Sequence, residues 1–261
     1  LKEIRSINAE KERINTELSL ANRIQKSMLP GIFPAFPERK EFDIFACMRT
    51  AKAVGGDFYD FFLIDENHLC LVMADVSGKG IPAALFMMAS KIILDSCAML
   101  GKTPAEILSK TNQAISSNNA EEMFVTVWLG ILDISTGELT AANAGHEYPM
   151  LMQSDGKFEP VLDKHGLFIG AIDGVKYTEY TLKLQPGAKL FLYTDGVTEA
   201  TNADGEMFGI DRTVAALNTC ADSAARELLH NMQNSIDSFV KEAEQLDDIA
   251  MLCLEYRGND A

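Results

Sequence analysis

Apolar residues recur at spacings of three and four along the first 28 residues. The inward positions of this heptad pattern are Ile4, Ile7, Lys11, Ile14, Leu18, Ala21, Gln25 and Met28. The pattern predicts a helix with one apolar seam, which Lys11 and Gln25 weaken. Two interpretations fit: a two-stranded coiled coil that carries a signal from an upstream domain, or one amphipathic helix that lies on the domain that follows.

The next segment is rich in proline. Pro30, Pro34 and Pro37 end the helix and impose an extended connector. We therefore predict three parts: a helical linker or coiled coil at 1–29, a connector at 30–40 and one larger domain at 41–258. Because the chain begins inside a helical pattern and without Met, we expect it to be the C-terminal piece of a longer protein.

Beyond residue 41 the pattern changes to short apolar runs separated by turn residues. These runs predict strands at 42–48, a hairpin over 57–75, and further strands at 123–134, 139–144, 148–153, 176–184, 189–194 and 249–255. Helices are predicted at 80–100, at 103–118 and at 223–243. We expect the first of these to be largely buried, because both of its faces are apolar.

The order of these elements predicts the fold class. Strands follow one another in hairpin order, with two helices inserted together and another late in the chain, and this favours an α+β layered domain. A doubly wound parallel sheet would need regular alternation of strands and helices, which the sequence lacks.

Composition narrows the functional class. The net charge of -15 argues against nucleic-acid binding, which needs a basic patch. Five cysteines, an odd number without a CxxC pair, predict buried free thiols in a reducing compartment. The longest apolar run, 81–89, is far shorter than the ~20 residues that span a bilayer, so we expect no membrane crossing.

Four aspartates stand where predicted strands meet turns, at Asp57, Asp75, Asp195 and Asp247. A single aspartate of this kind is commonly a turn residue or a helix cap. Four of them at the ends of apolar runs, with few basic residues nearby, indicate a cluster that binds divalent cations, since hard cations prefer oxygen ligands.

Such a cluster suits hydrolysis at phosphorus. Two cations held close together can activate a water molecule and neutralise phosphoryl oxygens, so no nucleophilic Ser or Cys is needed. The sequence contains no GxSxG, HExxH or GxxxxGK[ST] motif.

A set of motifs in this order resembles one family. The motifs are GGDFYDF, ADVSGKGIPAAL, NAGHEYPM, LYTDGVTEA, DGEMFG and DDIAMLCL, preceded by ANRIQKSMLP. They are similar to those of the RsbU/SpoIIE branch of the PPM serine/threonine phosphatases, over about residues 20–258. The resemblance implies a four-layer α-β-β-α sandwich with two Mn²⁺ or Mg²⁺ ions at one edge.

The resemblance also implies roles for individual residues. Asp57 and Asp75 would help to bridge the two ions, with the backbone carbonyl of Val76 as a further ligand. Asp195 and Asp247 would hold one ion of the pair. Asp248 is the weaker candidate of the Asp247–Asp248 doublet, because the family pattern places the ligand first.

The sequence departs from the family pattern in places. Ser77 stands where eukaryotic relatives carry a histidine that can act as a general acid. No arginine can be assigned as a phosphate clamp; Arg49, Lys52 and Lys79 are candidates only by nearness in sequence. His146 has no partner at metal-ligand spacing, so we interpret it as a structural residue that hydrogen-bonds a loop.

Three other functions share features with this sequence. The GGDF letters of 55–58 are similar to the diguanylate cyclase turn, but Phe58 stands where that family needs Glu. A hydrolase of small phosphate esters would use the same metals. A catalytically silent scaffold would be expected to lack one of the metal-binding aspartates, and all four are present.

The resemblance implies a setting as well. It predicts a phosphatase that acts on phosphoserine or phosphothreonine of a STAS-domain protein, an antagonist of an anti-sigma factor. We expect a cytoplasmic output domain of a larger signalling protein, whether or not that protein is anchored in a membrane. We also expect a homodimer formed through the N-terminal helix, and no direct membrane contact by this chain.

Overall fold

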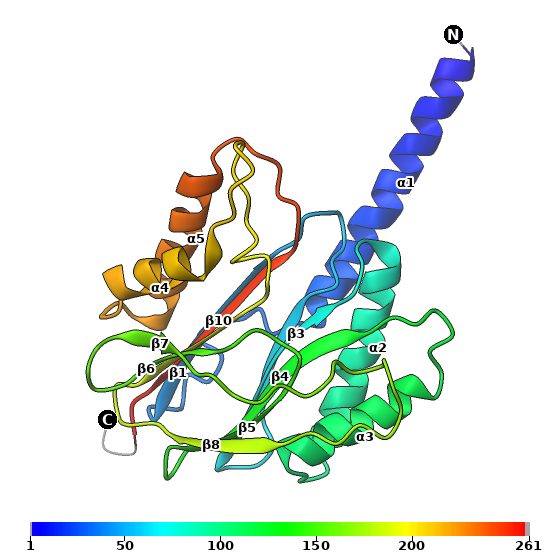
Figure 1. Ribbon diagram of the computed structural model, residues 1–261. Helices are drawn as coiled ribbons and strands as arrows, with labels where there is room; N and C mark the ends of the chain where they lie inside the picture. Colours follow the sequence, from blue (N-terminus) through cyan, green and yellow to red (C-terminus); the bar gives the residue numbers. More distant parts are fainter. Residues whose placement is uncertain (1, 259–261) are drawn as a thin grey trace.

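The computed structural model describes residues 2–258 and shows a sandwich of two antiparallel sheets with helices on both outer faces (Figure 1). The helices are α1 (Lys2–Ser27), α2 (Ile81–Ala98), α3 (Pro104–Ser116), α4 (Gly209–Thr219) and α5 (Ala225–Val240). Within the described residues this is the predicted α-β-β-α architecture, preceded by a helix.

Each sheet has five strands. The first, sheet A, has the order β1 (Phe42–Arg49), β10 (Ile249–Tyr256), β9 (Lys189–Tyr193), β6 (Met150–Met152) and β7 (Phe158–Pro160). The second, sheet B, has the order β2 (Phe58–Leu63), β3 (His68–Val76), β4 (Val125–Asp133), β5 (Glu138–Ala144) and β8 (Glu179–Lys183). Strand β10, the last described strand in the sequence, lies inside sheet A between β1 and β9.

Two hydrophobic clusters hold the layers together. One fills the space between the sheets and continues under α2 and α3, with Trp128 fully buried and its Nε1–H donating to the Tyr180 hydroxyl at 2.7 Å. The other lies between sheet A and the pair α4 and α5, where Phe191 and Leu228 are fully buried. The sandwich is the usual way to bury the apolar faces of two sheets.

Most predicted elements are present, but two were missed, and one helix is more exposed than predicted. Helix α4 and the three-residue strand β7 had not been predicted. The prediction that the helix at 80–100 is largely buried is wrong for the stripe of Ile81, Leu85 and Ile92, which are 54%, 63% and 53% exposed. The buried face of α2 is formed instead by small and mixed residues such as Ala83, Met87 and Leu94.

The apolar character of α2 also changes the membrane expectation. Over 18 residues it has a mean hydropathy of 1.5, so by length and composition it could cross a membrane, contrary to the estimate from the run at 81–89. This signal is weak, because core helices of soluble proteins share it, and α2 packs against β3 and α3.

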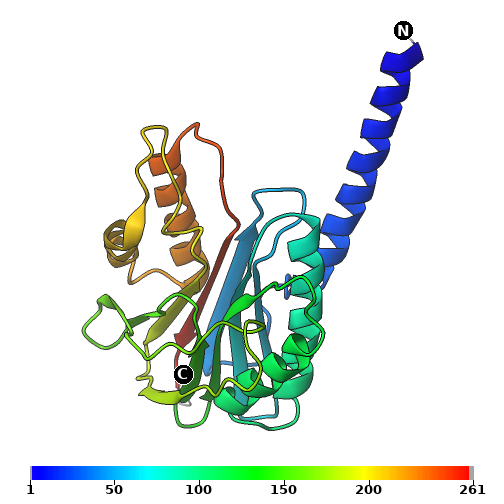
Figure 2. The same cartoon turned by 45° about the vertical axis from the view of Figure 1, so that its right-hand side comes forward.

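Helix α1 projects away from the sandwich (Figures 1 and 2). On its predicted seam, Ile4, Ile7 and Ile14 are 63%, 60% and 46% exposed. Only the last turns contact the domain, where Gln25 is 1% exposed. A helix lying along the domain is therefore wrong for the first half of α1, and the coiled coil stays a prediction, as does the division of the chain into three parts.

The cysteines are all free, as predicted. Cys70, Cys220 and Cys253 are buried, whereas Cys47 and Cys97 are only partly buried.

Candidate metal centre

The pairing of β2 with β3 brings two of the predicted ligands together. The strands are antiparallel, with Phe58 opposite Ala74, so the start of β2 and the end of β3 lie at the same edge of sheet B. Asp57 immediately precedes β2, and Asp75 and Val76 are the last residues of β3. The two carboxylates lie close enough for the charge of Asp75 to raise the pKa of Asp57.

Sheet A supplies the other ligands in the same way. Tyr193 of β9 lies opposite Met251 of β10, so the residue that follows β9 meets those that precede β10. Asp195 and Asp247 therefore converge at the edge of sheet A that adjoins Asp57 and Asp75, and their charges act on one another and on Asp75. The structure thus gathers all four predicted aspartates from both sheets.

The second member of the Asp247–Asp248 doublet has a different position. The Asp248 carboxylate accepts hydrogen bonds from the backbone N–H groups of Ala51 and Gly56, both at 2.8 Å. These bonds tie sheet A to the loop that carries Asp57 and occupy the carboxylate. This geometry gives a physical reason for the weaker candidacy of Asp248 as a ligand.

Two glycines next to ligands are required by this packing. A Cβ atom at Gly55 would lie 2.2 Å from Asp248 Oδ2, and one at Gly196 would lie 1.8 Å from the Asp248 carbonyl oxygen. No side chain fits at either distance. The glycines of the GGD and TDG motifs therefore allow Asp248 to approach the backbone on both sides of the site.

The crowding of carboxylates shifts their titration. Burial, and then the charges of Asp75 and Asp247, raise the pKa of Asp195 to about 7. Burial also raises the pKa of Asp75 to about 6, with Asp247 and Asp248 adding to the shift. For Asp57, burial and the charge of Asp75 hold the pKa well above its usual range. Ionisation of this cluster therefore requires a compensating positive charge.

One buried oxygen tests whether a metal fits. Asp57 is 2% exposed, and its Oδ2 has no hydrogen-bond partner among the described residues. A buried carboxylate oxygen without a partner is costly unless a cation binds it. The donor set, composed of carboxylates beside a backbone carbonyl, suits a hard divalent cation such as Mn²⁺ or Mg²⁺.

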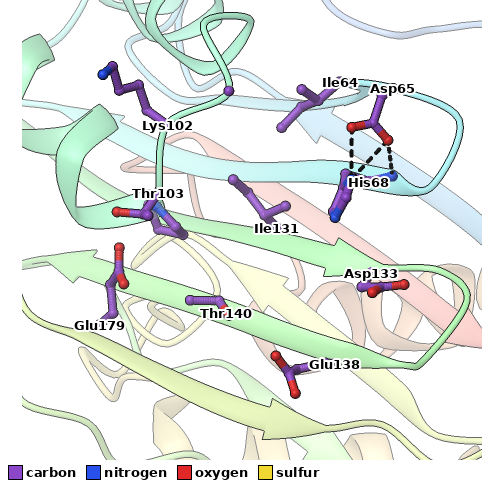
Figure 3. A pocket seen from close by; sticks show the side chains of 12 residues that line it. Ile64, Asp65, His68, Lys102, Thr103, Ile131, Asp133, Glu138, Thr140 and Glu179 are labelled. Atoms are coloured by element: carbon purple, nitrogen blue, oxygen red, sulfur yellow. Dashed lines mark hydrogen bonds and ion pairs between the residues drawn. The ribbon is translucent and has the colours of Figure 1, made fainter.

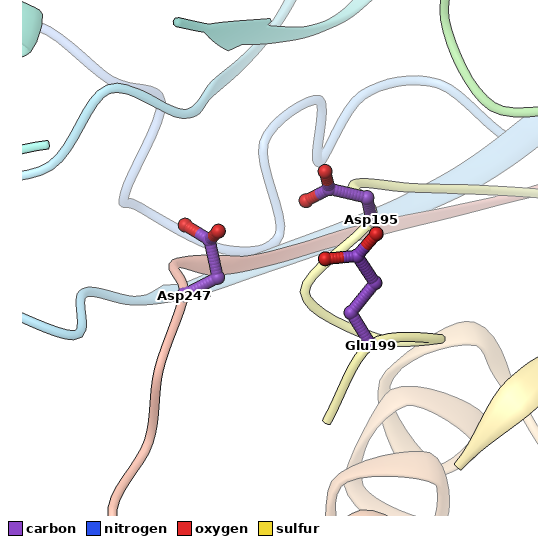
Figure 4. Close-up of side chains that lie close together, drawn as sticks. All are labelled: Asp195, Glu199 and Asp247. Atoms are coloured by element: carbon purple, nitrogen blue, oxygen red, sulfur yellow. The ribbon is translucent and has the colours of Figure 1, made fainter. Parts of the chain in front are cut away.

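Glu199 joins the site and had been missed from the sequence. Single carboxylate oxygens of Asp195, Glu199 and Asp247 all lie within 4.8 Å of one another (Figure 4). The Glu199 N–H donates to the Asp195 carbonyl at 2.8 Å, and this turn brings the two side chains together. The four-residue spacing in TDGVTE was the available signal, but an exposed Glu in a turn resembles an ordinary solvated residue.

His146 links the two sheets behind the aspartates. Its Nε2 lies 3.0 Å from the Tyr193 carbonyl of β9, and its Nδ1 lies 2.9 Å from the Thr126 hydroxyl of β4. Since a carbonyl can only accept, Nε2 carries the proton and Nδ1 accepts from Thr126. Burial lowers the pKa of His146 to about 3, so the ring is neutral. The expected structural role is confirmed. The ring joins β9, which is followed by Asp195, to β4, which pairs with the strand that carries Asp75.

Ser77 is held by the backbone. Its hydroxyl accepts from the N–H of Phe124 at 3.0 Å, and its own N–H donates to the Phe124 carbonyl at 2.9 Å. These bonds fix the loop that follows Asp75. Ser77 therefore has a structural task at the position where eukaryotic relatives carry the histidine.

The base of α1 contacts the same loop as Asp57. Gln25 Nε2 donates to the Gly55 carbonyl at 2.6 Å, and the Gly55 N–H donates to Gln25 Oε1 at 3.1 Å. The polar residue that interrupts the predicted seam is thus buried against the GGD motif. This contact joins the projecting helix to the loop before Asp57.

A polar hollow of about 420 Å³ lies elsewhere, at the opposite ends of β2 and β3 (Figure 3). His68 Nδ1 lies 2.8 Å from Asp65 at its rim, and Thr103 and Glu179 also line it. None of the predicted metal ligands lines this hollow, so we place the chemistry at the aspartate cluster.

Comparisons with known proteins show similarities in sequence and in fold. The family model described as Stage II sporulation protein E (SpoIIE) matches residues 65–257, which include three of the four aspartates but not Asp57. Protein IcfG of Synechocystis sp. is 31% identical over 91% of this chain and 41% of that protein. Phosphoserine phosphatase RsbU of Bacillus subtilis is 30% identical over 86% of this chain and 66% of that protein.

A solved structure extends the similarity to the fold. The SiaA-PP2C domain of Pseudomonas aeruginosa superposes with a TM-score of 0.84 and 26% identity, covering 95% of this chain and 99% of that one. The chain therefore corresponds to a whole domain of this structural neighbour, whereas it spans 41% and 66% of the two curated relatives.

Proposed function

This chain belongs to the SpoIIE family of PP2C-type serine/threonine phosphatases, and from that premise we propose that it hydrolyses phosphoserine or phosphothreonine of a protein partner. The observation that carries the proposal is the convergence of four aspartates from two sheets around an unpartnered buried oxygen of Asp57. PP2C-type phosphatases depend on metal ions. The finer proposal is a pair of Mn²⁺ or Mg²⁺ ions held by Asp57, Asp75, Asp195, Asp247 and the Val76 carbonyl.

Each part of the site has a task in this proposal. Bound there, two divalent cations would lower the pKa of water and neutralise phosphoryl oxygens. Asp57 and Asp75 come from sheet B, and Asp195 and Asp247 from sheet A, so the packing of the sheets sets the spacing of the ligands. Asp248 and His146 hold the two sides in register.

The test is phosphatase activity on para-nitrophenyl phosphate with Mn²⁺, with EDTA, and in the variant Asp195→Asn. Activity should require Mn²⁺ and fall to background in EDTA and in the variant. Asp204→Asn, an exposed aspartate of the next loop, is the matched control and should keep its activity.

Calorimetric titration with Mn²⁺ separates the alternatives. A wild-type chain that neither binds Mn²⁺ nor hydrolyses the ester would overturn the proposal in favour of a silent scaffold. Binding without activity would point to a domain held off until its dimer or partner is present. Activity on small esters but on no phosphoprotein would favour a small-molecule phosphohydrolase.

We propose a phosphorylated STAS-domain protein as the substrate and the cytoplasm as the location. Support comes from the similarity to RsbU, which is named a phosphoserine phosphatase, and from the free cysteines. Phosphate release from a purified phosphorylated STAS protein should exceed release from free phosphoserine at equal concentration. Equal rates would count against a protein substrate.

We further propose that α1 pairs with α1 of a second copy. Its exposed seam residues Ile7 and Ile14 would be buried in that pairing. Ile7→Glu together with Ile14→Glu should yield a monomer by sedimentation, whereas the adjacent pair Asn8→Glu and Asn15→Glu should not. A wild-type chain that sediments as a monomer at all accessible concentrations would contradict the pairing.

A further inference from the structure

Three basic residues lie near the aspartates in the sequence, and the structure gives each of them a different environment. Arg49 points to α5, where its Nη1 lies 2.8 Å from Asp237 Oδ1. Lys52 has no ion pair within residues 2–258 and is exposed. Lys79 alone of the three pairs with a proposed ligand, with its Nζ 2.6 Å from Asp247 Oδ2.

The ammonium group of Lys79 is held by two acceptors from one loop. Besides Asp247, Nζ donates to the Leu246 carbonyl at 2.6 Å. An ammonium group has three N–H donors, so these two bonds leave one donor uncommitted. The Lys79 side chain is 38% exposed, which leaves the group open to solvent and to a ligand.

Local sequence explains how Lys79 reaches across the site. The residue lies between Gly78 and Gly80, whose φ angles are 84° and 80°. Only glycine adopts this conformation readily, and no atom lies within 4 Å of a Cβ placed at Gly78, so conformation rather than crowding selects glycine there. The turn directs Lys79 from sheet B toward the loop before β10 in sheet A.

The position of Lys79 beside the carboxylates suits it to bind a negatively charged substrate. A phosphate monoester carries negative charge into a site whose own side chains are carboxylates, and those carboxylates repel it. Cations reduce that repulsion, and a lysine with a free donor also fixes the orientation of a phosphoryl oxygen. Among the described residues, Lys79 is the basic side chain paired with an aspartate of this cluster.

We propose that Lys79 is the phosphate-binding residue of the site: Asp247 and Leu246 hold its ammonium group in place, and the third N–H donates to a non-bridging oxygen of a phosphate monoester. The proposal rests on the proposed phosphatase function. It assigns to one lysine the task for which the sequence offered three candidates.

The test compares orthophosphate binding in Lys79→Met and wild-type protein, both loaded with Mn²⁺. Calorimetry and inhibition of para-nitrophenyl phosphate hydrolysis both report this binding. We expect the variant to bind orthophosphate roughly ten- to a hundredfold more weakly, as for loss of a hydrogen bond to a charged group. The KM should rise in parallel, while the affinity for Mn²⁺ stays within about twofold.

A matched variant tests the competing lysine. Lys52→Met removes the same charge from the neighbouring loop and should leave orthophosphate affinity unchanged. Loss of orthophosphate affinity in Lys52→Met, with retention in Lys79→Met, would overturn the assignment. So would a Lys79→Met variant that loses Mn²⁺ affinity but keeps orthophosphate affinity, since Lys79 would then act on the Asp247 loop.

Failure of this proposal is distinguishable from failure of the phosphatase function. An active wild-type enzyme whose Lys79→Met variant binds orthophosphate equally well overturns the role of Lys79 alone. A wild-type chain that neither binds Mn²⁺ nor hydrolyses any phosphoester overturns the function without using any lysine variant.

Discussion

Two groups of buried and partly buried acidic residues in this domain balance their negative charge in different ways. Between α2 and β2, Lys91 Nζ lies 2.5 Å from Asp60 Oδ2 and 2.7 Å from Asp95 Oδ2, and the Lys91 side chain is 9% exposed. At the sandwich edge, five aspartates gather around one partly exposed lysine, and a buried oxygen of Asp57 has no partner in the described chain.

The difference separates a structural ion cluster from a site. The Asp60–Lys91–Asp95 group contains its own buried cation, which pairs with one oxygen of each aspartate, although Asp95 Oδ1 has no hydrogen-bond partner among the described residues. The edge cluster has more negative charge than its side chains neutralise, so it needs a ligand from outside. The balance of buried charge, more than the number of acids, marks the functional edge.

The largest effect is expected for Lys91, the buried cation of the Asp60–Lys91–Asp95 group. Lys91→Met leaves Asp60 and Asp95 without their cation, and breaking a buried pair in this way costs about 3–5 kcal/mol. Urea unfolding should show this loss, with Mn²⁺ affinity of the folded protein unchanged. The exposed Lys110→Met on α3 is the control, expected within about 0.5 kcal/mol of wild type. An unchanged midpoint for Lys91→Met would remove the distinction drawn above.

A smaller effect is expected from the residue that links the sheets at the edge. His146→Ala removes both bonds and should weaken Mn²⁺ binding roughly ten- to a hundredfold, as for other residues that orient metal ligands. His146→Gln, which can still donate to the Tyr193 carbonyl, should recover part of this loss. The exposed His68→Ala serves as the control.

One outcome would contradict a role of His146 in metal binding. If His146→Ala and His146→Gln lose equal amounts of thermal stability and neither changes Mn²⁺ affinity, His146 supports the fold alone.

Protons should compete with Mn²⁺ for the edge cluster. The raised pKa values mean that Asp195 holds its proton up to about pH 7 and Asp75 up to about pH 6. Mn²⁺ needs the ionised forms, so its affinity should fall as pH is lowered from 7.5 to 5.5, by at most about tenfold per pH unit for each displaced proton. Calorimetry at each pH gives the slope, and a flat profile would contradict the shifts.

The same raised pKa values have the opposite effect on the stability of the chain in EDTA, because there they favour the folded state at low pH. The folded pKa values lie above the unfolded ones, so between about pH 4 and pH 7 the folded state binds more protons. The free energy of unfolding in EDTA should therefore decrease as pH rises through that window. Saturating Mn²⁺ should restore stability at pH 7.5.

The smallest effect is expected for Glu199. This side chain is exposed and lies beside Asp195 and Asp247, so Glu199→Gln should weaken Mn²⁺ binding about two- to fivefold. Glu242→Gln, an exposed glutamate after α5, should have no effect. A Glu199 variant with unchanged Mn²⁺ affinity would limit the site to the aspartates.

The sequence revealed the fold because strand and turn signals were strong and local. Hairpin order predicted an α+β layered domain, and the motif resemblance predicted the sandwich of two sheets. Strand β7 is three residues long, too short for a pattern of alternation, and α4 follows a glycine-rich loop without a clear start signal. The exposed face of α2 could not be chosen in advance, since apolar residues on both sides leave the periodicity ambiguous.

The candidate site was predictable in its aspartates and not in their partners. Asp57, Asp75, Asp195 and Asp247 stand at strand ends, where sequence position implies spatial position. The bonds of Asp248 to Ala51 and Gly56 and the bridge made by His146 join residues that are far apart in the chain. Such contacts follow from the packing of the sheets, which no local pattern specifies.

The place of β10 in sheet A has a consequence for biosynthesis. This strand is the last in the described sequence, yet it lies between β1 and β9 and follows the Asp247–Asp248 doublet. A ribosome must therefore complete the chain to at least residue 256 before β1 and β9 can be joined and the two ligand-bearing edges can meet. A chain that stops before β10 lacks the strand that joins β1 to β9, so the proposed metal centre assembles only in the finished domain.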